Sequence, residues 1–303
     1  MMEQTQEIAY YPGCTMKSET SNGVGFEHSA LASAKALGLN IKEMEKWYCC
    51  GTVYSMISDD VMKHISSARN LVKVQETGSS EVMTLCSMCY QTMEMANQIL
   101  INNPDKRKTI SLFMTEEPEY QGEIHVHHFL EVLFDKVGIQ KIKSSVKNSL
   151  KGLRVAPYYG CAVTRPKSTG FDSFDDPHVL HDILTALGAE VVENPFQEEC
   201  CGSYHTVSRK DIVSRRTYDI TMASIEEHVD MMVLTCPLCQ YNLDSGQKLC
   251  FDVSKGHQTI PVVYFTQLLA IALGLDPKVC KFENHYVNPM TILESKNIIK
   301  IEK

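Results

Sequence analysis

Cysteines are the residues of this 303-residue chain that are best suited to chemistry, and it has twelve of them. Two adjacent pairs stand out, Cys49–Cys50 in "KWYCCGTVY" and Cys200–Cys201 in "EECCGSYH". Adjacent Cα atoms lie about 3.8 Å apart, whereas an ordinary disulfide needs roughly 4.4–6.8 Å, so a bridge within a pair would be strained. A glycine follows each pair and can adopt the positive φ of a sharp bend. The pairs therefore indicate a shared ligand better than a disulfide.

Ten of the twelve cysteines repeat with the same spacing. The first set comprises Cys14, Cys49, Cys50, Cys86 and Cys89, and the second comprises Cys161, Cys200, Cys201, Cys236 and Cys239. Equivalent positions are 147 to 151 residues apart, and the flanks agree, as "IAYYPGC" with "VAPYYGC" and "VMTLCSMC" with "MVLTCPLC". Such self-similarity indicates an internal duplication. We predict domains 1–150 and 151–303, which meet in the polar segment 143–152.

The pattern of elements is the same in both halves. Short apolar, β-prone runs precede the first cysteine and the C-x-x-C of each half, and segments 26–39 and 177–189 have helical periodicity. Strands that alternate with helices imply a mostly parallel sheet. We therefore predict an α/β fold of two similar Rossmann-like halves, related by a pseudo-twofold axis. Segment 104–122 is predicted to be a surface excursion.

The predicted elements place the cysteines where ligands gather. Cys14, Cys86, Cys161 and Cys236 follow predicted strands, and ligands of open parallel sheets bind beyond the carboxyl ends of the strands. Each C-x-x-C lies where a helix should begin, and a helix N-terminus favours thiolates.

Composition limits the class of protein. The chain is 44% apolar and 22% charged, with a net charge of −8 and no basic block, which disfavours nucleic acid as a partner. No apolar run approaches the roughly 18 residues of a membrane span, and the start lacks the apolar core of a signal peptide. We expect a cytoplasmic protein. Thiols in a reducing compartment indicate metal or redox chemistry rather than disulfides.

Three interpretations of each cysteine set remain open at this point. The cysteines could be buried apolar residues, but duplicated register argues against that. They could bind structural zinc, which needs four ligands and leaves one thiol over. They could bind an iron–sulfur cluster, for which thiolates are the standard ligands, and five thiols exceed what a cubane requires.

At these residues the sequence resembles the cysteine-rich CCG domain, and two copies in one chain resemble the B subunit of heterodisulfide reductase. The segments "VHHFLEVL" and "IPVVYFTQLLAIALGLDP" are similar to that family as well. The resemblance implies two 4Fe–4S clusters of the non-cubane type, one held by each of the two cysteine sets given above. After the second pair the chain reads "SYHTVS", where methanogen enzymes have a glycine-rich loop, so the substrate is left open.

The activity that the resemblance implies is reduction of a small-molecule disulfide, CoM-S-S-CoB or a related heterodisulfide. Reduction of a disulfide takes two electrons. Two clusters that each transfer one electron would explain why the domain is duplicated. The chain has no nucleotide or flavin fingerprint. The resemblance implies a ferredoxin-like C subunit and a flavin-containing A subunit as electron donors, with a hydrogenase or formate dehydrogenase module as a further candidate partner.

Two alternatives to the reductase are kept. CCG subunits also serve lactate, glycolate, glycerol-3-phosphate and quinone-linked oxidoreductases, although the fused ferredoxin motif frequent there is absent from this chain. The other alternative is an electron-relay subunit whose clusters touch no substrate.

Residues outside the cysteine sets are further candidates. His205 is a candidate proton donor near the second set. Lys17, Arg165 and Lys167 could bind anionic groups of a substrate, with solvated surface charge as the other interpretation. For "HVHH", which holds His125, His127 and His128, a partly buried strand edge is favoured over a metal site. Cys250 and Cys280 are predicted to be ordinary thiols.

Overall fold

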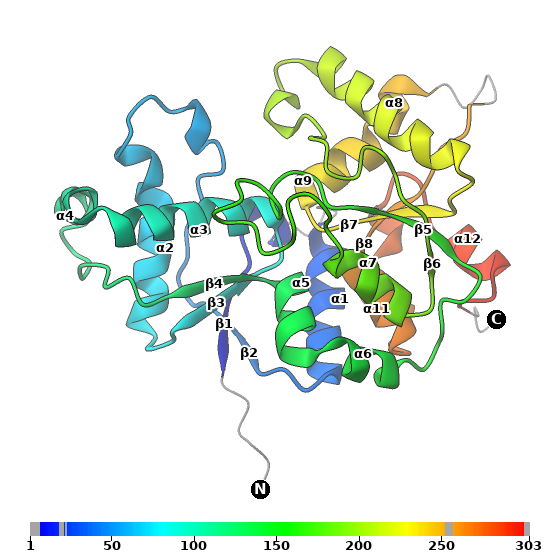
Figure 1. Ribbon diagram of the computed structural model, residues 1–303, viewed down its shortest axis with the longest axis horizontal. Helices are drawn as coiled ribbons and strands as arrows, with labels where there is room; N and C mark the ends of the chain where they lie inside the picture. Colours follow the sequence, from blue (N-terminus) through cyan, green and yellow to red (C-terminus); the bar gives the residue numbers. More distant parts are fainter. Residues whose placement is uncertain (1–6, 18–20, 22, 252–256, 300–303) are drawn as a thin grey trace, which may run out of the picture.

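Two parallel four-stranded sheets form the framework of the chain. The computed structural model describes residues 7–17, 21, 23–251 and 257–299 (Figure 1). The strands of the first sheet are β1 (Ile8–Tyr11), β2 (Ile41–Glu43), β3 (Glu81–Thr84) and β4 (His125–His128). Those of the second are β5 (Arg154–Tyr158), β6 (Glu190–Val191), β7 (Met231–Leu234) and β8 (Val262–Tyr264). The strand orders, β2-β1-β3-β4 and β6-β5-β7-β8, are equivalent, which confirms the predicted fold class.

The central strands are apolar because helices cover the sheets. All four residues of β1 and of β7 are buried, as are four of the five in β5. Continuous apolar runs of this kind are typical of parallel strands that are buried on both faces. In each sheet the central pairs are β1–β3 and β5–β7, with β1 Ala9 opposite Val82 and β5 Val155 opposite Met231. The first cysteine and the C-x-x-C of each half follow these central strands, whereas the cysteine pairs follow the edge strands β2 and β6.

Helices connect the strands in both halves. The first half contains α1 (Gly23–Ala36), α2 (Ile65–Glu76), α3 (Ser87–Asn102), α4 (Pro104–Phe113), α5 (Phe129–Val132) and α6 (Ile139–Ser145). The second half contains α7 (Val179–Ala186), α8 (Lys210–Glu226), α9 (Pro237–Gln240), α10 (Gln247–Cys250), α11 (Phe265–Ala272) and α12 (Met290–Ser295). The predicted excursion 104–122 begins with α4, whose Leu112 and Phe113 are exposed, so this surface segment is partly helical. Within the described ranges, no helix is long and apolar enough to cross a membrane.

The two halves pack through helices that belong to opposite sheets. Helix α1 of the first half lies against α11 of the second (Figure 1). The rings of Phe26 and Tyr264 stack with centroids 4.2 Å apart, and Ser29 Oγ lies 2.7 Å from Thr266 Oγ1. Helix α5 contacts α7 in the corresponding place. The halves therefore share one continuous core, and the boundary near residue 150 stays a prediction.

Candidate iron–sulfur site

Each half presents its first cysteine in a glycine-containing turn directly after its first strand. Gly13, with φ +76°, separates β1 from Cys14, and Gly160, with φ +66°, precedes Cys161. A Cβ atom added at Gly13 would lie 3.2 Å from Cys89 Sγ, and one at Gly160 would lie 3.5 Å from Cys239 Sγ. A side chain at either position would be strained because of the positive φ, and at Gly13 it would also crowd the thiol of Cys89. The glycines thus let the turn approach the C-x-x-C of the same half.

The cysteine pairs lie in sharp turns, as the sequence predicted. Gly51 has φ +78° and Gly202 has φ +82°, the left-handed region that glycine adopts without strain. In the first turn Ser66 Oγ donates to Cys49 O and Ser67 Oγ donates to Cys50 O, each at 2.8 Å.

Side chains from α8 and from the segment after α9 anchor the second turn. Arg216 Nε donates to Cys200 O at 3.1 Å, and Asn242 Nδ2 donates to Cys201 O at 3.2 Å. The turn shape is therefore fixed by protein contacts in both halves.

A tyrosine in each half ties the first strand to the cysteine pair. Tyr11 donates its hydroxyl to Tyr48 O at 2.7 Å, directly before Cys49. Tyr158 donates its hydroxyl to Glu199 O, directly before Cys200. Sequence reasoning missed both hydrogen bonds, although a tyrosine three residues before the first cysteine of each half was the available signal.

The C-x-x-C motifs occupy helix N-termini. Cys86 is the N-cap of α3 and Cys236 is the N-cap of α9, so Cys89 and Cys239 fall in the first turns. Backbone N–H groups at a helix start are unpaired donors and stabilise negative charge. Hydrogen bonds from the thiols of Cys239 and Cys86 lower the pKa of Cys236 well below its ordinary value, and the backbone N–H groups of Leu238 and Cys239 lower it further.

Within each half the five thiols form one hydrogen-bonded row. In the first half the contacts run in the order Cys14, Cys49, Cys50, Cys89, Cys86. In the second half they run in the equivalent order Cys161, Cys200, Cys201, Cys239, Cys236, with Cys201 Sγ 3.3 Å from Cys239 Sγ. The structure thus brings together all ten sequence-predicted cysteines, five in each half.

The two rows meet at one contact. The thiol of Cys86 donates a hydrogen bond to the sulfur of Cys236, which raises the pKa of Cys86 and lowers that of Cys236. Both side chains are buried, at 3% exposure each. Beside them Ser87 Oγ lies 2.8 Å from Thr235 Oγ1. Residues 150 positions apart therefore join the two cysteine sets into one group of ten sulfurs, which no local sequence pattern predicted.

The outer ends of the rows are more accessible than the inner ends. Cys14 and Cys49 are exposed and their counterparts Cys161 and Cys200 are half-buried, whereas Cys86, Cys89, Cys236 and Cys239 are buried. Hydrogen bonds from the thiols of Cys14 and Cys50 and from backbone N–H groups lower the pKa of Cys49 to about 2. The same contacts in the second half lower the pKa of Cys200 to about 2. The thiolate, the form that binds metal, is thus favoured at the first cysteine of each pair, whereas the hydrogen bond to Cys49 raises the pKa of Cys50 to about 12.

The donor chemistry of each row fits an iron–sulfur group. Every member is a thiol, and thiolates are the ligands of such clusters. Within the described ranges, no three His, Cys, Asp or Glu side chains are arranged to hold a single metal ion. The sulfurs lie as neighbours in a row instead.

The two remaining cysteines are set apart by their contacts. Cys250 Sγ donates to the carbonyl oxygens of Gly246 and Gln247, each at 3.6 Å. Cys280 is fully buried, and its Sγ donates to Gln267 O at 3.5 Å. These contacts agree with the prediction that both are ordinary thiols.

Of the three predicted anion-binding cations, Lys17 and Arg165 have intramolecular contacts. Lys17 Nζ forms ion pairs with Glu27 at 3.0 Å and Glu43 at 2.8 Å. Arg165 lies over the ring of Phe174, with 5.2 Å from Cζ to the centroid, and Lys167 is exposed. A substrate role for these residues stays a prediction.

The histidines that the sequence singled out lie in different parts of the structure. His205 is exposed at the end of η5 (Ser203–His205), and its role as a proton donor stays a prediction. The "HVHH" segment is β4, an edge strand, with His125 exposed and His128 buried, in agreement with the favoured interpretation. His127 Nδ1 lies 3.3 Å from Glu131 Oε2 in a cavity of about 270 Å³ between the halves.

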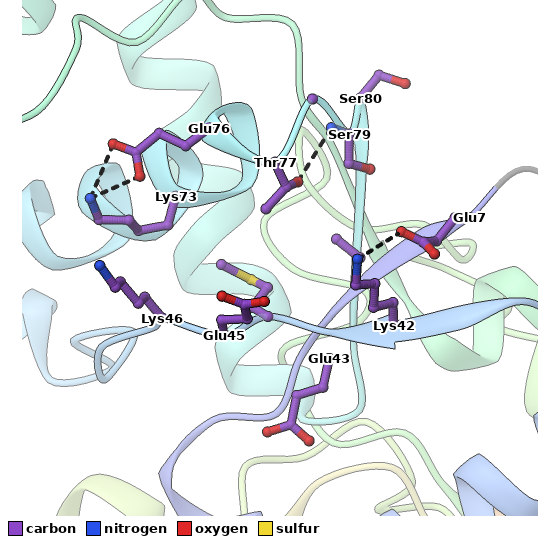
Figure 2. Close-up of a pocket in the computed structure, with 13 residues that line it drawn as sticks. Glu7, Lys42, Glu43, Glu45, Lys46, Lys73, Glu76, Thr77, Ser79 and Ser80 are labelled. Carbon is purple, nitrogen blue, oxygen red and sulfur yellow. Dashed lines mark hydrogen bonds and ion pairs between the residues drawn. The ribbon is translucent and has the colours of Figure 1, made fainter.

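A larger cavity of about 610 Å³ lies away from the cysteines. It is lined by the edge strand β2, the end of α2 and the turn before β3, and no cysteine lines it (Figure 2). Its charges pair with one another, as Lys42 with Glu7 at 3.8 Å and Lys73 with Glu76 at 3.0 Å. The cavity is therefore separate from the two cysteine rows.

Comparisons with known proteins agree with the cysteine pattern. The sequence profile of the CCG family, described as a cysteine-rich domain, matches residues 8–94 and 155–244. The chain is 32% identical to the 8-methylmenaquinol:fumarate reductase membrane anchor subunit of Wolinella succinogenes, over 90% of this chain and 94% of that protein. It is also 32% identical to a protein of Archaeoglobus profundus that is named as similar to the B subunit of heterodisulfide reductase, over 80% of this chain and 83% of that protein.

More distant relatives extend the same similarity. The B subunit of a ferredoxin/F(420)H(2)-dependent CoB-CoM heterodisulfide reductase from Methanosarcina acetivorans is 25% identical over 95% of this chain and 96% of its own length. Among solved structures, a hypothetical protein from Helicobacter pylori superimposes with a TM-score of 0.68 at 12% identity over 92% of this chain. The chain spans 51% of that longer protein, and the likeness concerns the fold alone.

Proposed function

The chain belongs to the cysteine-rich CCG family, and from this premise we propose that it is the catalytic iron–sulfur subunit of a heterodisulfide reductase-type complex. The observation that carries the proposal is the contact between Cys86 and Cys236, which joins two equivalent five-thiol rows. A disulfide has two sulfurs and takes up two electrons. Two equivalent groups that meet at one point are suited to a substrate with two equivalent reacting atoms.

The residues that would hold the clusters are the two five-cysteine rows, one cluster to a row. When bound, each cluster would supply one electron at a time, and a non-cubane cluster would leave an iron for a substrate sulfur. The protein fixes the thiols through the glycine turns and the hydrogen bonds to the carbonyl oxygens of the paired cysteines. These contacts keep the outer sulfurs accessible while the inner four stay buried.

The overall reaction balances with two electrons and two protons. The S–S bond of R–S–S–R′ breaks, each sulfur gains one electron and one proton, and two thiols leave. The electrons come from partner proteins, for which a ferredoxin-like and a flavin-containing subunit are proposed from the family. His205, exposed beside the second cysteine pair, is the proposed proton donor.

The experiment that tests this function is turnover of a defined disulfide. The full chain, purified anaerobically with its neighbouring subunits, should consume two electrons per CoM-S-S-CoB and release two thiols. It should contain about eight irons and eight acid-labile sulfides, the content of two four-iron clusters. Two zinc ions without sulfide would overturn the iron–sulfur assignment, and eight irons without disulfide turnover would overturn the activity alone.

A second candidate function is electron transfer in a quinone-linked complex. The observation that favours it is the 32% identity to the fumarate reductase anchor subunit, over most of both chains. Reduction of the clusters by a quinol, with no disulfide turnover, would support this candidate.

A further inference from the structure

One side chain joins the two cysteine-pair turns. Tyr204, in η5, comes three residues after Cys201, and its hydroxyl donates to Thr52 O at 3.1 Å. Thr52 comes two residues after Cys50 in the other half and is 152 positions away in the sequence. The hydrogen bond therefore links the turn that follows one cysteine pair with the turn that follows the other.

The duplication does not require this link. In the aligned segments "CCGTVYS" and "CCGSYHT", the position of Tyr204 corresponds to Val53, whose side chain is 51% exposed. The next residue of the first half, Tyr54, donates its hydroxyl to Met95 Sδ at 2.8 Å within its own half. The tyrosine of the second half thus donates a hydrogen bond to the other half, whereas the tyrosine of the first half donates one within its own half. The link is an asymmetric addition to a symmetric site.

The phenol of Tyr204 lies close to the thiols of both halves. Burial raises its pKa, and the nearby sulfurs of Cys161, Cys200 and Cys50 raise it further. The first two belong to the second row and the last belongs to the first row. The ring is half-buried and is hydrogen-bonded at its outer end. The phenol therefore lies beside cysteine thiols of both rows.

We propose that Tyr204 is a positioning and specificity-determining residue that holds the two cysteine-pair turns together and limits the size of the molecule that can reach both thiol rows. The hydrogen bond to Thr52 fixes the separation of the turns. The part of the proposal that concerns substrate size rests on the proposed disulfide chemistry, whereas the part that concerns access does not.

The access part is tested by removing iron from the full chain as purified. Tyr204→Phe deletes only the hydroxyl, and Tyr204→Val installs the residue of the other half. We expect a bulky chelator, bathophenanthroline disulfonate, to remove iron from Tyr204→Phe about threefold to tenfold faster than from wild type, the ratio expected when one ordinary hydrogen bond is lost, and from Tyr204→Val faster still. Tyr241→Phe, which alters an exposed tyrosine of the same half, should match wild type.

Two outcomes overturn the access part. Equal chelation rates for wild type and both Tyr204 variants would show that the phenol does not control access. An increase in Tyr204→Phe as large as that in Tyr204→Val would leave no role for the ring. If Tyr204→Val does not retain iron, the comparison is made between Tyr204→Phe and wild type. The electron paramagnetic resonance spectrum of the reduced clusters then checks that the clusters of Tyr204→Phe are intact.

The substrate-size part is tested with a small and a bulky disulfide. Tyr204→Val should lower the KM for the bulky disulfide relative to the small one, with kcat for the small one changed less. An unchanged KM ratio, with turnover present, would overturn this part. Absence of disulfide turnover in wild type and all variants would overturn the proposed function instead, while the chelation rates still decide the access part.

Discussion

The contacts of individual cysteines distinguish those of the candidate iron–sulfur site from the others. Cys201 is buried, and its sulfur lies 3.3 Å from that of Cys239, whereas Cys250 Sγ donates to backbone carbonyl oxygens close to it in sequence. We expect Cys201→Ser to lose the second cluster, about four of eight irons, because a hydroxyl is a poor replacement for a thiolate. Cys250→Ser should keep the full iron content. Iron and sulfide analysis of the two purified variants makes the comparison, and loss of iron from Cys250→Ser would contradict the assignment.

Another prediction at this scale concerns a hydrogen bond to sulfur in the second half. Asn242 Nδ2 lies 3.8 Å from Cys201 Sγ, and the equivalent position of the first half is Thr92, which donates to Met88 O instead. Hydrogen bonds to ligand sulfurs help to set cluster potentials by stabilising the more negative, reduced form. Asn242→Leu should lower the reduction potential of one cluster by about 20–60 mV. This is the free energy of one ordinary hydrogen bond converted to a potential for a one-electron couple.

A redox titration followed by electron paramagnetic resonance measures this shift. Thr206→Ala serves as the control, because it removes the hydrogen bond that Thr206 donates to Asn242 Oδ1 at 3.0 Å and leaves Nδ2 in place. Equal potentials in wild type and Asn242→Leu would show that the amide does not act on the sulfur.

At the scale of elements, a glycine in α1 permits the packing of the two halves. A Cβ atom at Gly25 would lie 2.3 Å from Cys280 O, a backbone atom that cannot swing away. Gly25→Ala should therefore destabilise the chain by about 1–3 kcal/mol, as overpacking does. Lys35→Ala, on the exposed face of the same helix, should change stability by less than about 0.5 kcal/mol. Urea unfolding of both variants tests this, and equal stabilities would show that α1 tolerates displacement.

The segment before α12 is attached through a buried histidine. His285 Nδ1 lies 3.0 Å from Val262 O in β8, and its Nε2 lies 2.9 Å from Gln267 Nε2. Burial lowers the pKa of His285 to about 4. Between pH 6.5 and 4 the unfolded histidine binds a proton that the folded one does not, so stability falls as the pH falls, by up to about 1.4 kcal/mol per pH unit.

His285→Gln should reduce this loss of stability at low pH without abolishing it, because burial also lowers the pKa of His128 to about 4. Urea unfolding at pH 4.5 and pH 7 measures the difference. An unchanged pH slope in His285→Gln would contradict the buried neutral state of His285.

A buried carboxyl in the same region changes stability with pH in the opposite direction to His285. Asp244 accepts the backbone N–H groups of Tyr286 and Val287, and burial raises its pKa to about 6. The folded state then binds the proton between pH 3.8 and 6, so the contribution of Asp244 to stability is present at low pH and is lost as the pH rises to 6. Asp244→Asn should make the acid loss of stability steeper than in wild type. A shallower slope would show that Asp244 is ionised in the folded chain.

At the scale of the whole molecule, the sequence predicted the features that repeat in both halves, but it did not predict the contacts between the halves. Both cysteine sets, the strands before them and the helices at each C-x-x-C were predictable because each depends on residues near in sequence. The stacking of Phe26 on Tyr264, the contact of Cys86 with Cys236 and the hydrogen bond of Tyr204 to Thr52 were not. Each joins residues about 150 or more positions apart, and no local pattern specifies which surfaces of two domains meet.

The cross-half contact leads to a prediction about the two rows as a unit. If each row supplies one electron to one substrate sulfur, neither can complete disulfide reduction alone. Cys86→Ser and Cys236→Ser remove the two residues that meet between the rows, and each single variant should show near-background disulfide turnover while it keeps the other cluster. The double variant should be little worse than either single one, because residues that act as a unit are strongly non-additive.

Stopped-flow reduction and steady-state turnover separate this mechanism from electron relay. One-electron reduction of the surviving cluster should persist in each single variant, which iron analysis and electron paramagnetic resonance confirm independently of turnover. In a relay, the two rows differ in their distance from the electron donor, so loss of the farther cluster leaves much of the electron flow intact. Substantial disulfide turnover in Cys86→Ser or Cys236→Ser, with the respective cluster shown to be absent, would therefore exclude the two-row mechanism and favour the relay.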